Sequence, residues 1–215
     1  SIMMIVTAVS FSNYPKMNNR LSLDLTTQDI ALTIRQAQVY GTTVFGAEGG
    51  SSVALSTAYG VHFEPVSTLT TNPDAAAYQL FNDTYTDSTP GGGSPKFLQC
   101  NTKGIFAPAD GDYCVQSYKL SGKEVIKGYC KDFDKITGAT FKDRTDCVNV
   151  DYYKISEDFS VYFDRPSLEA KFDFQYSDGA SPGQANNIAI IVQSESSGDR
   201  RAIIVWKTGQ ISIEQ

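Results

Sequence analysis

Imidazole chemistry has one candidate in this chain of 215 residues, because His62 is its only histidine. His62 lies in the strand-like segment AYGVHFE, and Glu64, two residues on, shares its face and could orient it. No Ser or Cys close to it in sequence lies in a nucleophile-elbow context such as GxSxG. We therefore expect a structural histidine. Since no acid, base and nucleophile converge in the sequence, we expect a protein that is not an enzyme.

Paired carboxylates, at Asp83 and Asp87 and at Asp132 and Asp134, are the candidate metal ligands. Aspartate in polar segments usually serves turns, where its side chain bonds the local backbone. The segment NDTYTDS, which contains Asp83 and Asp87, could supply oxygen ligands to Ca²⁺ but lacks the Gly and closing Glu of an EF-hand. It is a weak metal candidate, and we expect neither a metal nor a cofactor.

Four cysteines, Cys100, Cys114, Cys130 and Cys147, lie 14 to 17 residues apart. These spacings are too wide for a zinc knuckle, and no CxxC pair occurs. An even number of cysteines in one loop-rich region instead favours two disulfides and an oxidising, extracytoplasmic setting. Three pairings are possible, with free buried thiols as the alternative. We expect Cys100–Cys114 and Cys130–Cys147, because each closes a short hairpin-like loop.

The charge balance gives little support to a nucleic-acid binder. The net charge is −6, whereas such proteins usually carry a basic face. Arg200 and Arg201, in the segment GDRRA, form the basic doublet near the C-terminus, with Lys207 a few residues on. We keep these three residues as a possible DNA contact that is not favoured over a solvated turn.

The elements that must position these residues begin with an uncharged segment, Ile2 to Phe11 (IMMIVTAVSF). Its ten residues are about half of what spans a bilayer, and we expect them to continue a longer hydrophobic helix that starts upstream. Pro15 should kink or locally open this helix, because proline lacks an N–H and clashes with the preceding turn. The residues assigned to an assembly helix here are Ile2, Ile5, Val9, Phe11 and Pro15.

From Arg20 to Tyr40 the helical pattern shows two opposed apolar stripes at 100° per residue. The Leu23 stripe consists of Leu23, Ile30, Ile34 and Ala37, and the Leu25 stripe of Leu21, Leu25, Leu32 and Val39. A helix that covers one domain needs one stripe, so the second predicts a second partner, unless a single domain buries the helix on both sides. The periodicity leaves open which stripe faces the sheet. We assign the Leu23 stripe to helix-to-sheet packing and the Leu25 stripe to assembly, and we expect Gly41 to end the helix as its C′ residue.

Beyond Gly41 the pattern changes to short β-branched or aromatic segments bounded by Gly, Pro, Asn, Asp and Ser. The last two are joined by Lys207-Thr208-Gly209, a tight hairpin signal. We therefore predict an α+β fold: a helix over residues 1–41 packed on an antiparallel, disulfide-stapled β-domain over residues 42–215. The predicted strands are Thr42–Phe45, Tyr59–Phe63, Tyr78–Phe81, Tyr113–Lys119, Phe159–Phe163, Ala170–Tyr176, Ile188–Gln193, Arg201–Trp206 and Gln210–Ile213.

Several segments together resemble type IV pilin-like proteins, most closely the pseudopilin and minor-pilin group of the GspH and FimT type. The resemblance lies in IMMIVTAVSF with the proline after it, and in QDIALTIRQAQVYG, YGVHFE, YQLFND, FDRPSLEA and RRAIIVWKTGQISIE. It implies a helix that is anchored in the inner membrane before assembly and packed afterwards in the core of an extracellular filament. The partners it implies are identical or homologous pilin subunits. The family's processing motif, Phe followed closely by Glu, is not in the sequence, so processing rests on the resemblance alone.

The function expected from stripes and resemblance is a structural subunit of a type IV pilus-like or type II secretion pseudopilus filament. Two alternatives belong to the binding class. One is a pilus-associated receptor for DNA uptake that would use Arg200, Arg201 and Lys207. The other is a membrane-tethered adhesin or carbohydrate-binding domain with exposed tyrosines as a stacking platform.

Overall fold

The computed structural model describes residues 2–43, 58–64, 77–83, 113–120, 123–131, 133, 152–153, 159–164, 167–174 and 185–214. Within the long N-terminal helix, side chains are described from Met17 onward. The described part is an α+β structure in which this helix packs on two antiparallel sheets. The predicted fold class is confirmed at that level.

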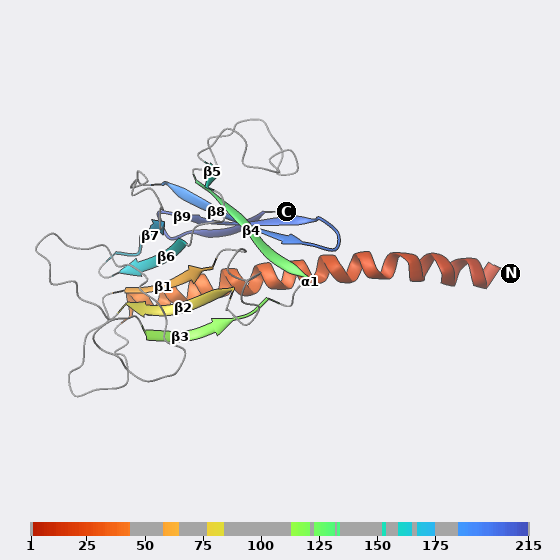
Figure 1. The fold of residues 1–215 in the computed structure, drawn as a ribbon, viewed down its shortest axis with the longest axis horizontal. Helices are drawn as coiled ribbons and strands as arrows, with labels where there is room; N and C mark the ends of the chain where they lie inside the picture. The colour runs from red at the N-terminus through yellow and green to blue at the C-terminus, as the bar shows by residue number, and fades with distance from the viewer. Residues whose placement is uncertain are drawn as a thin grey trace, which may run out of the picture.

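Helix α1 runs from Ile2 to Thr42 as one element of 41 residues. It continues through Pro15, so the expected local opening does not occur: proline removes one hydrogen bond from the ladder while the turns on either side remain helical. The N-terminal part of α1 extends well beyond the sheets, and its C-terminal part lies against them (Figure 1). In the described part of the chain, no helix is both long and apolar enough to cross a membrane.

The first sheet has the strand order β3-β2-β1-β6-β7, with every pair antiparallel. Its central strand β1 pairs Val61 with Leu80 on one side and with Val161 on the other. The inner strands β1 and β6 are buried on both faces and contain mostly aromatic and small or β-branched residues, whereas the edge strands β3 and β7 are partly exposed. The strands are β1 Ala58–Phe63, β2 Tyr78–Asp83, β3 Tyr113–Tyr118, β6 Phe159–Asp164 and β7 Ala170–Phe174.

The second sheet has the order β10-β9-β8-β4-β5, also antiparallel throughout. Two of its strands were missed from sequence: β4 contains Lys127 and Gly128, which break the apolar pattern, and β5 is only two residues long. The pairing of β4 with β8 shifts register between Ile126 and Gly128. The strands are β4 Glu124–Lys131, β5 Tyr152–Tyr153, β8 Asn187–Ser194, β9 Arg200–Trp206 and β10 Ile211–Glu214.

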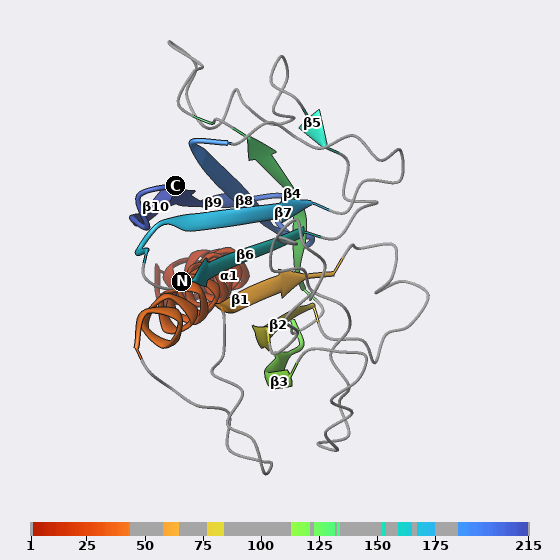
Figure 2. The ribbon, with the colours of Figure 1, turned by 90° about the vertical axis from the view of Figure 1, so that its left-hand side faces the viewer.

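The C-terminal part of α1 lies in the angle between the two sheets (Figure 2). One hydrophobic core joins all three elements: Ile34 of the helix, Val61 of the first sheet and Ile190 of the second are each fully buried in it. Smaller clusters cover the opposite face of each sheet, around Phe81 and Tyr162 on the first and around Ile204 on the second. The helix thus packs against both sheets at once, and both sheets fix its position.

Gly41 has a different role from the one predicted. It lies inside the last turn of α1, which ends at Thr42, and so it is not the residue that ends the helix. A Cβ added at Gly41 would lie 2.5 Å from the backbone oxygen of Phe163 and 2.9 Å from its Cβ. Glycine is required there because α1 approaches β6 closely. Thr42, predicted to open a strand, belongs to the helix instead, and residues 44–45 lie outside the described residues.

The predicted hairpin between β9 and β10 is present and serves as a junction. Gly209 takes a positive φ of 83°, and its N–H donates to the Trp206 oxygen at 2.8 Å. The Gln38 side chain donates from α1 to the Gly209 oxygen at 3.0 Å. The Ala170 N–H, at the start of β7, donates to the Lys207 oxygen at 2.8 Å. One turn therefore links the helix to both sheets.

Candidate assembly surface

The Leu25 stripe is exposed on α1. Leu21, Leu25, Leu32 and Val39 are 55%, 53%, 63% and 49% exposed, and Met17, further toward the N-terminus, is 72% exposed. A row of large apolar side chains on one helix face is uncommon on a monomer surface and usually marks an interaction site. The side chains of Ile2, Ile5, Val9, Phe11 and Pro15 lie outside the described residues, although their backbone is part of α1.

The Leu23 stripe lies on the opposite side of the same turns. Leu23, Ile30, Ile34 and Ala37 are each 0% exposed and belong to the core shared with both sheets. Two threonines on this side are also buried, and both are hydrogen-bonded within the helix. Thr27 donates to the Leu23 oxygen at 2.7 Å and Thr33 to the Asp29 oxygen at 2.9 Å. The alternative of a helix buried on both sides by one domain is therefore wrong for this part of α1.

Two ion pairs of opposite polarity tie α1 to the second sheet. Arg201 on β9 donates to Asp24 at 2.7 Å, with the two side chains 14% and 34% exposed. Arg20, one turn before Asp24, donates to Asp199 at 3.3 Å, with side chains 67% and 33% exposed. The first pair is shielded by the protein and the second is largely solvated, so screening by salt acts mainly on the second.

The three candidate DNA contacts do not form one patch. Arg200 and Arg201 are neighbours in β9 and therefore point to opposite faces of the sheet. Arg200 donates to the Gln193 side chain at 2.8 Å, while Arg201 pairs with Asp24. Lys207 follows the far end of β9, about 20 Å along the strand from Arg200. The structure thus disperses these three charges.

His62 lies within a polar row on the face of the first sheet that points away from α1. Its Nδ1 is 3.0 Å from Ser160 Oγ, and its Nε2 is 3.6 Å from Glu64 Oε1. The order Glu–His–Ser is that of a nucleophile relay. However, His62 is 1% and Ser160 2% exposed, so a substrate has no access to this serine in the structure. The contact with Ser160 instead gives the buried Nδ1 of His62 a hydrogen-bond partner within the sheet.

The remaining candidate residues fall only partly within the described chain. Asp83 is the last residue of β2, and Asp87 lies outside the described residues. The described residues hold no cluster of three or more metal-ligating side chains. Cys114 lies on β3 and Cys130 on β4, and neither is a free thiol. Cys100 and Cys147 lie outside the described residues, so both predicted pairings do too.

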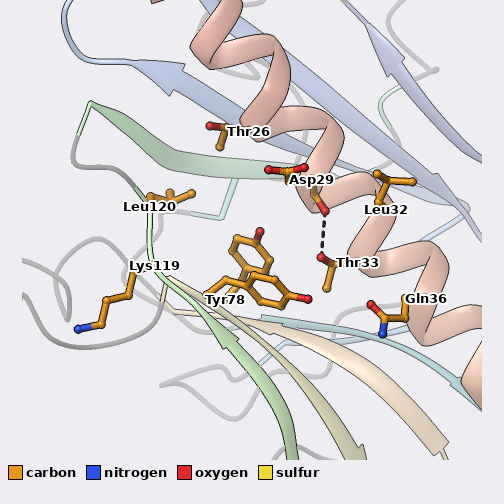
Figure 3. A pocket seen from close by; sticks show the side chains of 9 residues that line it. Thr26, Asp29, Leu32, Thr33, Gln36, Tyr78, Lys119 and Leu120 are labelled. Carbon is orange, nitrogen blue, oxygen red and sulfur yellow. Dashed lines mark hydrogen bonds between the residues drawn. The ribbon is translucent and has the colours of Figure 1, made fainter.

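A cavity of about 530 Å³ opens beside the Leu25 stripe, between α1 and the strands β2 and β3. Leu32 belongs to the stripe and also lines the cavity. The polar lining consists of Thr26, Asp29, Thr33, Gln36, Tyr78, Tyr118 and Lys119. The rings of Tyr78 and Tyr118 stack with centroids 4.6 Å apart and planes 10° apart. Figure 3 shows Asp29 above Tyr78, with Lys119 extending away from the helix.

The electrostatics of this cavity act on Tyr78. Its pKa is raised to about 12, chiefly by burial; a hydrogen bond with Thr33 opposes the rise, and the nearby Tyr118 and the Asp29 carboxylate add to it. The phenol is therefore uncharged at physiological pH, which leaves Asp29 as the negative charge beside it. Sequence reasoning missed this cavity because its walls come from residues 26–36, 78 and 118–120, which only the fold brings together.

Comparisons with known proteins add no assignment: no family model, characterised protein or solved structure matches the chain.

Proposed function

We propose that this protein is a structural subunit of a type IV pilus-like or pseudopilus filament, and that it assembles through the Leu25 stripe of α1. The observation that carries the proposal is one helix with two opposed apolar stripes, of which its own sheets bury one and leave the other 49% to 63% exposed. Burying a leucine side chain stabilises by about 1.5–3 kcal/mol. The exposed stripe therefore favours association with another apolar surface.

The shape of the molecule supports a filament rather than a closed pair. The N-terminal part of α1 projects beyond the β-domain as a rod (Figure 1). Rods of this kind can bundle along one axis while the sheets stay outside. A head-to-tail contact between such copies repeats without closing and so generates a helical filament.

Partners, location and disulfides follow from the same proposal. The partners are identical or homologous subunits, and the site of action is an extracellular filament whose subunits are held in the inner membrane before assembly. An oxidising location agrees with the absence of a free thiol at Cys114 and Cys130. The proposed pairs remain Cys100–Cys114 and Cys130–Cys147, which would close the connections preceding β3 and following β4.

The test is a double substitution, Leu25→Glu with Leu32→Glu, in the full chain expressed in the cells that naturally produce it. Both side chains are more than half exposed, so the fold should persist while the carboxylates resist burial between helices. We expect at least tenfold less protein in filaments sheared from the cells. Thermal unfolding of the purified full chain should be nearly unchanged.

A matched control is Leu168→Glu with Ile213→Glu, which changes two exposed apolar side chains that do not belong to α1. Leu168 is 60% and Ile213 38% exposed, so this variant adds the same charge to the surface of the β-domain. Filaments should form normally. Normal filaments from the Leu25→Glu, Leu32→Glu variant would show that the stripe is not an assembly surface.

A further inference from the structure

The Leu25 stripe has one exposed charged side chain on each flank, negative on one side and positive on the other. At 100° per residue, Asp29 and Arg35 lie about 60° to either side of the mean direction of the stripe. Both side chains are exposed, and among the described residues neither makes an ion pair or a side-chain hydrogen bond. Asp29 is on the side of the first sheet, at the cavity with Tyr78. Arg35 is on the other side, within about 20° of Asp24, which pairs with β9.

The cavity at Asp29 has the chemistry that binds a guanidinium group. A carboxylate accepts from its N–H fork, and an aromatic ring stacks on its plane. Asp29 supplies the carboxylate, and Tyr118, half-buried and stacked on Tyr78, supplies the ring. Lys119 also lines the cavity, but its side chain extends away from the helix (Figure 3), so the charge on the helix side of the cavity is that of Asp29.

The spacing along the helix selects the relative position of two copies. Leu25, Leu32 and Val39 are seven residues apart, so a parallel copy shifted by about 10.5 Å places each beside the next one of its neighbour. Asp29 and Arg35 are six residues apart, so they come level after a shift of about 9 Å. The two shifts differ by about 1.5 Å, which the long arginine side chain can accommodate. The apolar and charged contacts thus call for nearly the same offset.

We propose that Arg35 of one copy enters the cavity formed by Asp29, Tyr78 and Tyr118 of a second copy, and that this contact sets the axial offset between neighbouring subunits. The proposal rests on the filament function proposed above and identifies the contact that gives it direction. Because the two flanks differ, the contact is heterologous: each copy offers one arginine and one cavity.

The experiment is a charge exchange in the full chain, again scored by filaments sheared from cells. Asp29→Arg alone and Arg35→Asp alone each place like charges at the contact, and each should lower filament yield at least tenfold. The two changes together restore opposite charges and should return the yield to within about threefold of the unchanged protein. Glu169→Arg and Lys123→Asp, at exposed positions of the β-domain, are the matched charge controls and should have no effect.

Three outcomes would overturn the contact. The first is normal yield from both single variants while Leu25→Glu with Leu32→Glu abolishes filaments, which would leave the filament function standing. The second is loss in both single variants without recovery in the exchange, which would make another group, such as a soluble sugar or cation, the occupant of the cavity. The third is a measured axial offset between contacting copies, from electron microscopy of the filament, far from about 9–10.5 Å. If the stripe variant itself assembles normally, the filament function fails first.

Discussion

The two apolar faces of α1 between Leu21 and Val39 contain the same kinds of residue, yet one is buried and the other is exposed. Leu23, Ile30 and Ile34 are fully buried against both sheets, whereas Leu25 and Leu32, on the same turns, are more than half exposed. Hydrophobicity alone does not separate them. The difference lies in what surrounds the helix: two sheets meet on one side of it and leave the other open.

The comparison shows how one helix can serve folding and assembly at once. A stripe that is buried in the monomer stabilises the fold and contributes nothing further to association. A stripe that stays about half exposed contributes less to the fold and keeps the transfer free energy of its exposed area for a partner. Substitutions on the two faces should therefore separate stability from assembly.

The largest expected contrast is between Ile34→Ala and Leu32→Ala, two residues apart on opposite faces. Ile34 is 0% exposed, and truncation leaves a cavity between the helix and the sheets, so we expect the free energy of unfolding to fall by about 2–5 kcal/mol. Leu32 is 63% exposed, and its truncation should change stability by about 0.5 kcal/mol or less. Urea denaturation of the purified chains measures both.

Equal losses for the two variants would contradict the division of α1 into a folding face and an assembly face. A matched pair one turn earlier repeats the test with one residue type. Leu23→Ala should behave like Ile34→Ala, and Leu25→Ala like Leu32→Ala, because Leu23 is 0% and Leu25 53% exposed.

Much of the fold could be read from local patterns. The helical period of residues 20–40, the short aromatic and β-branched segment Tyr59–Phe63 and the Lys207-Thr208-Gly209 turn all correspond to observed elements. Strand β4 could not be read this way, since Lys127 and Gly128 interrupt its apolar run and its pairing with β8 is non-local. Gly41 was misread because its neighbour Phe163 lies 122 residues away.

The candidate surface was only half predictable for the same reason. Periodicity reveals two stripes, but which one the sheets cover depends on how the two sheets meet, and no local pattern contains that. The flanking charges Asp29 and Arg35 are visible in the sequence, yet Asp29 gains meaning only beside Tyr78 and Tyr118. Likewise Arg201, a candidate for DNA, is recognised as a structural residue only once Asp24 is placed against it.

Tyr78 lines the cavity beside Leu32, where the buried face of α1 meets its exposed face. The folded state keeps its proton up to a pKa of about 12, whereas the unfolded chain releases it near 10. The unfolded state therefore binds fewer protons between pH 10 and 12, and the contribution of Tyr78 to stability, complete below pH 10, falls as pH rises through this window. With solvent screening at the open cavity, we expect a loss on the order of 1–2 kcal/mol.

Urea denaturation at pH 9.5 and 11.5 measures this effect, with Tyr78→Phe as the comparison. Other tyrosines and lysines titrate in the same range in both proteins, so the difference between their pH slopes isolates Tyr78. A steeper fall for the unchanged chain is expected. If the free energy of unfolding falls equally with pH in both proteins, Tyr78 is solvated in the folded state. Its side of the cavity would then not belong to the buried packing of the fold.

The smallest expected effects come from the two ion pairs, which test how far the protected side of α1 extends. A double-mutant cycle on Asp24 and Arg201, with Asn and Gln as replacements, should give a coupling of about 1 kcal/mol, because the pair is 2.7 Å apart and mostly shielded. The cycle on Arg20 and Asp199 should give about 0.3 kcal/mol or less, since Arg20 is 67% exposed and the distance is 3.3 Å. Raising the salt to 1 M should reduce the second coupling to near zero and leave most of the first. Equal couplings with equal salt dependence would mean that the Asp24–Arg201 pair is as solvated as the Arg20–Asp199 pair. The second sheet would then shield less of α1 than its contacts suggest.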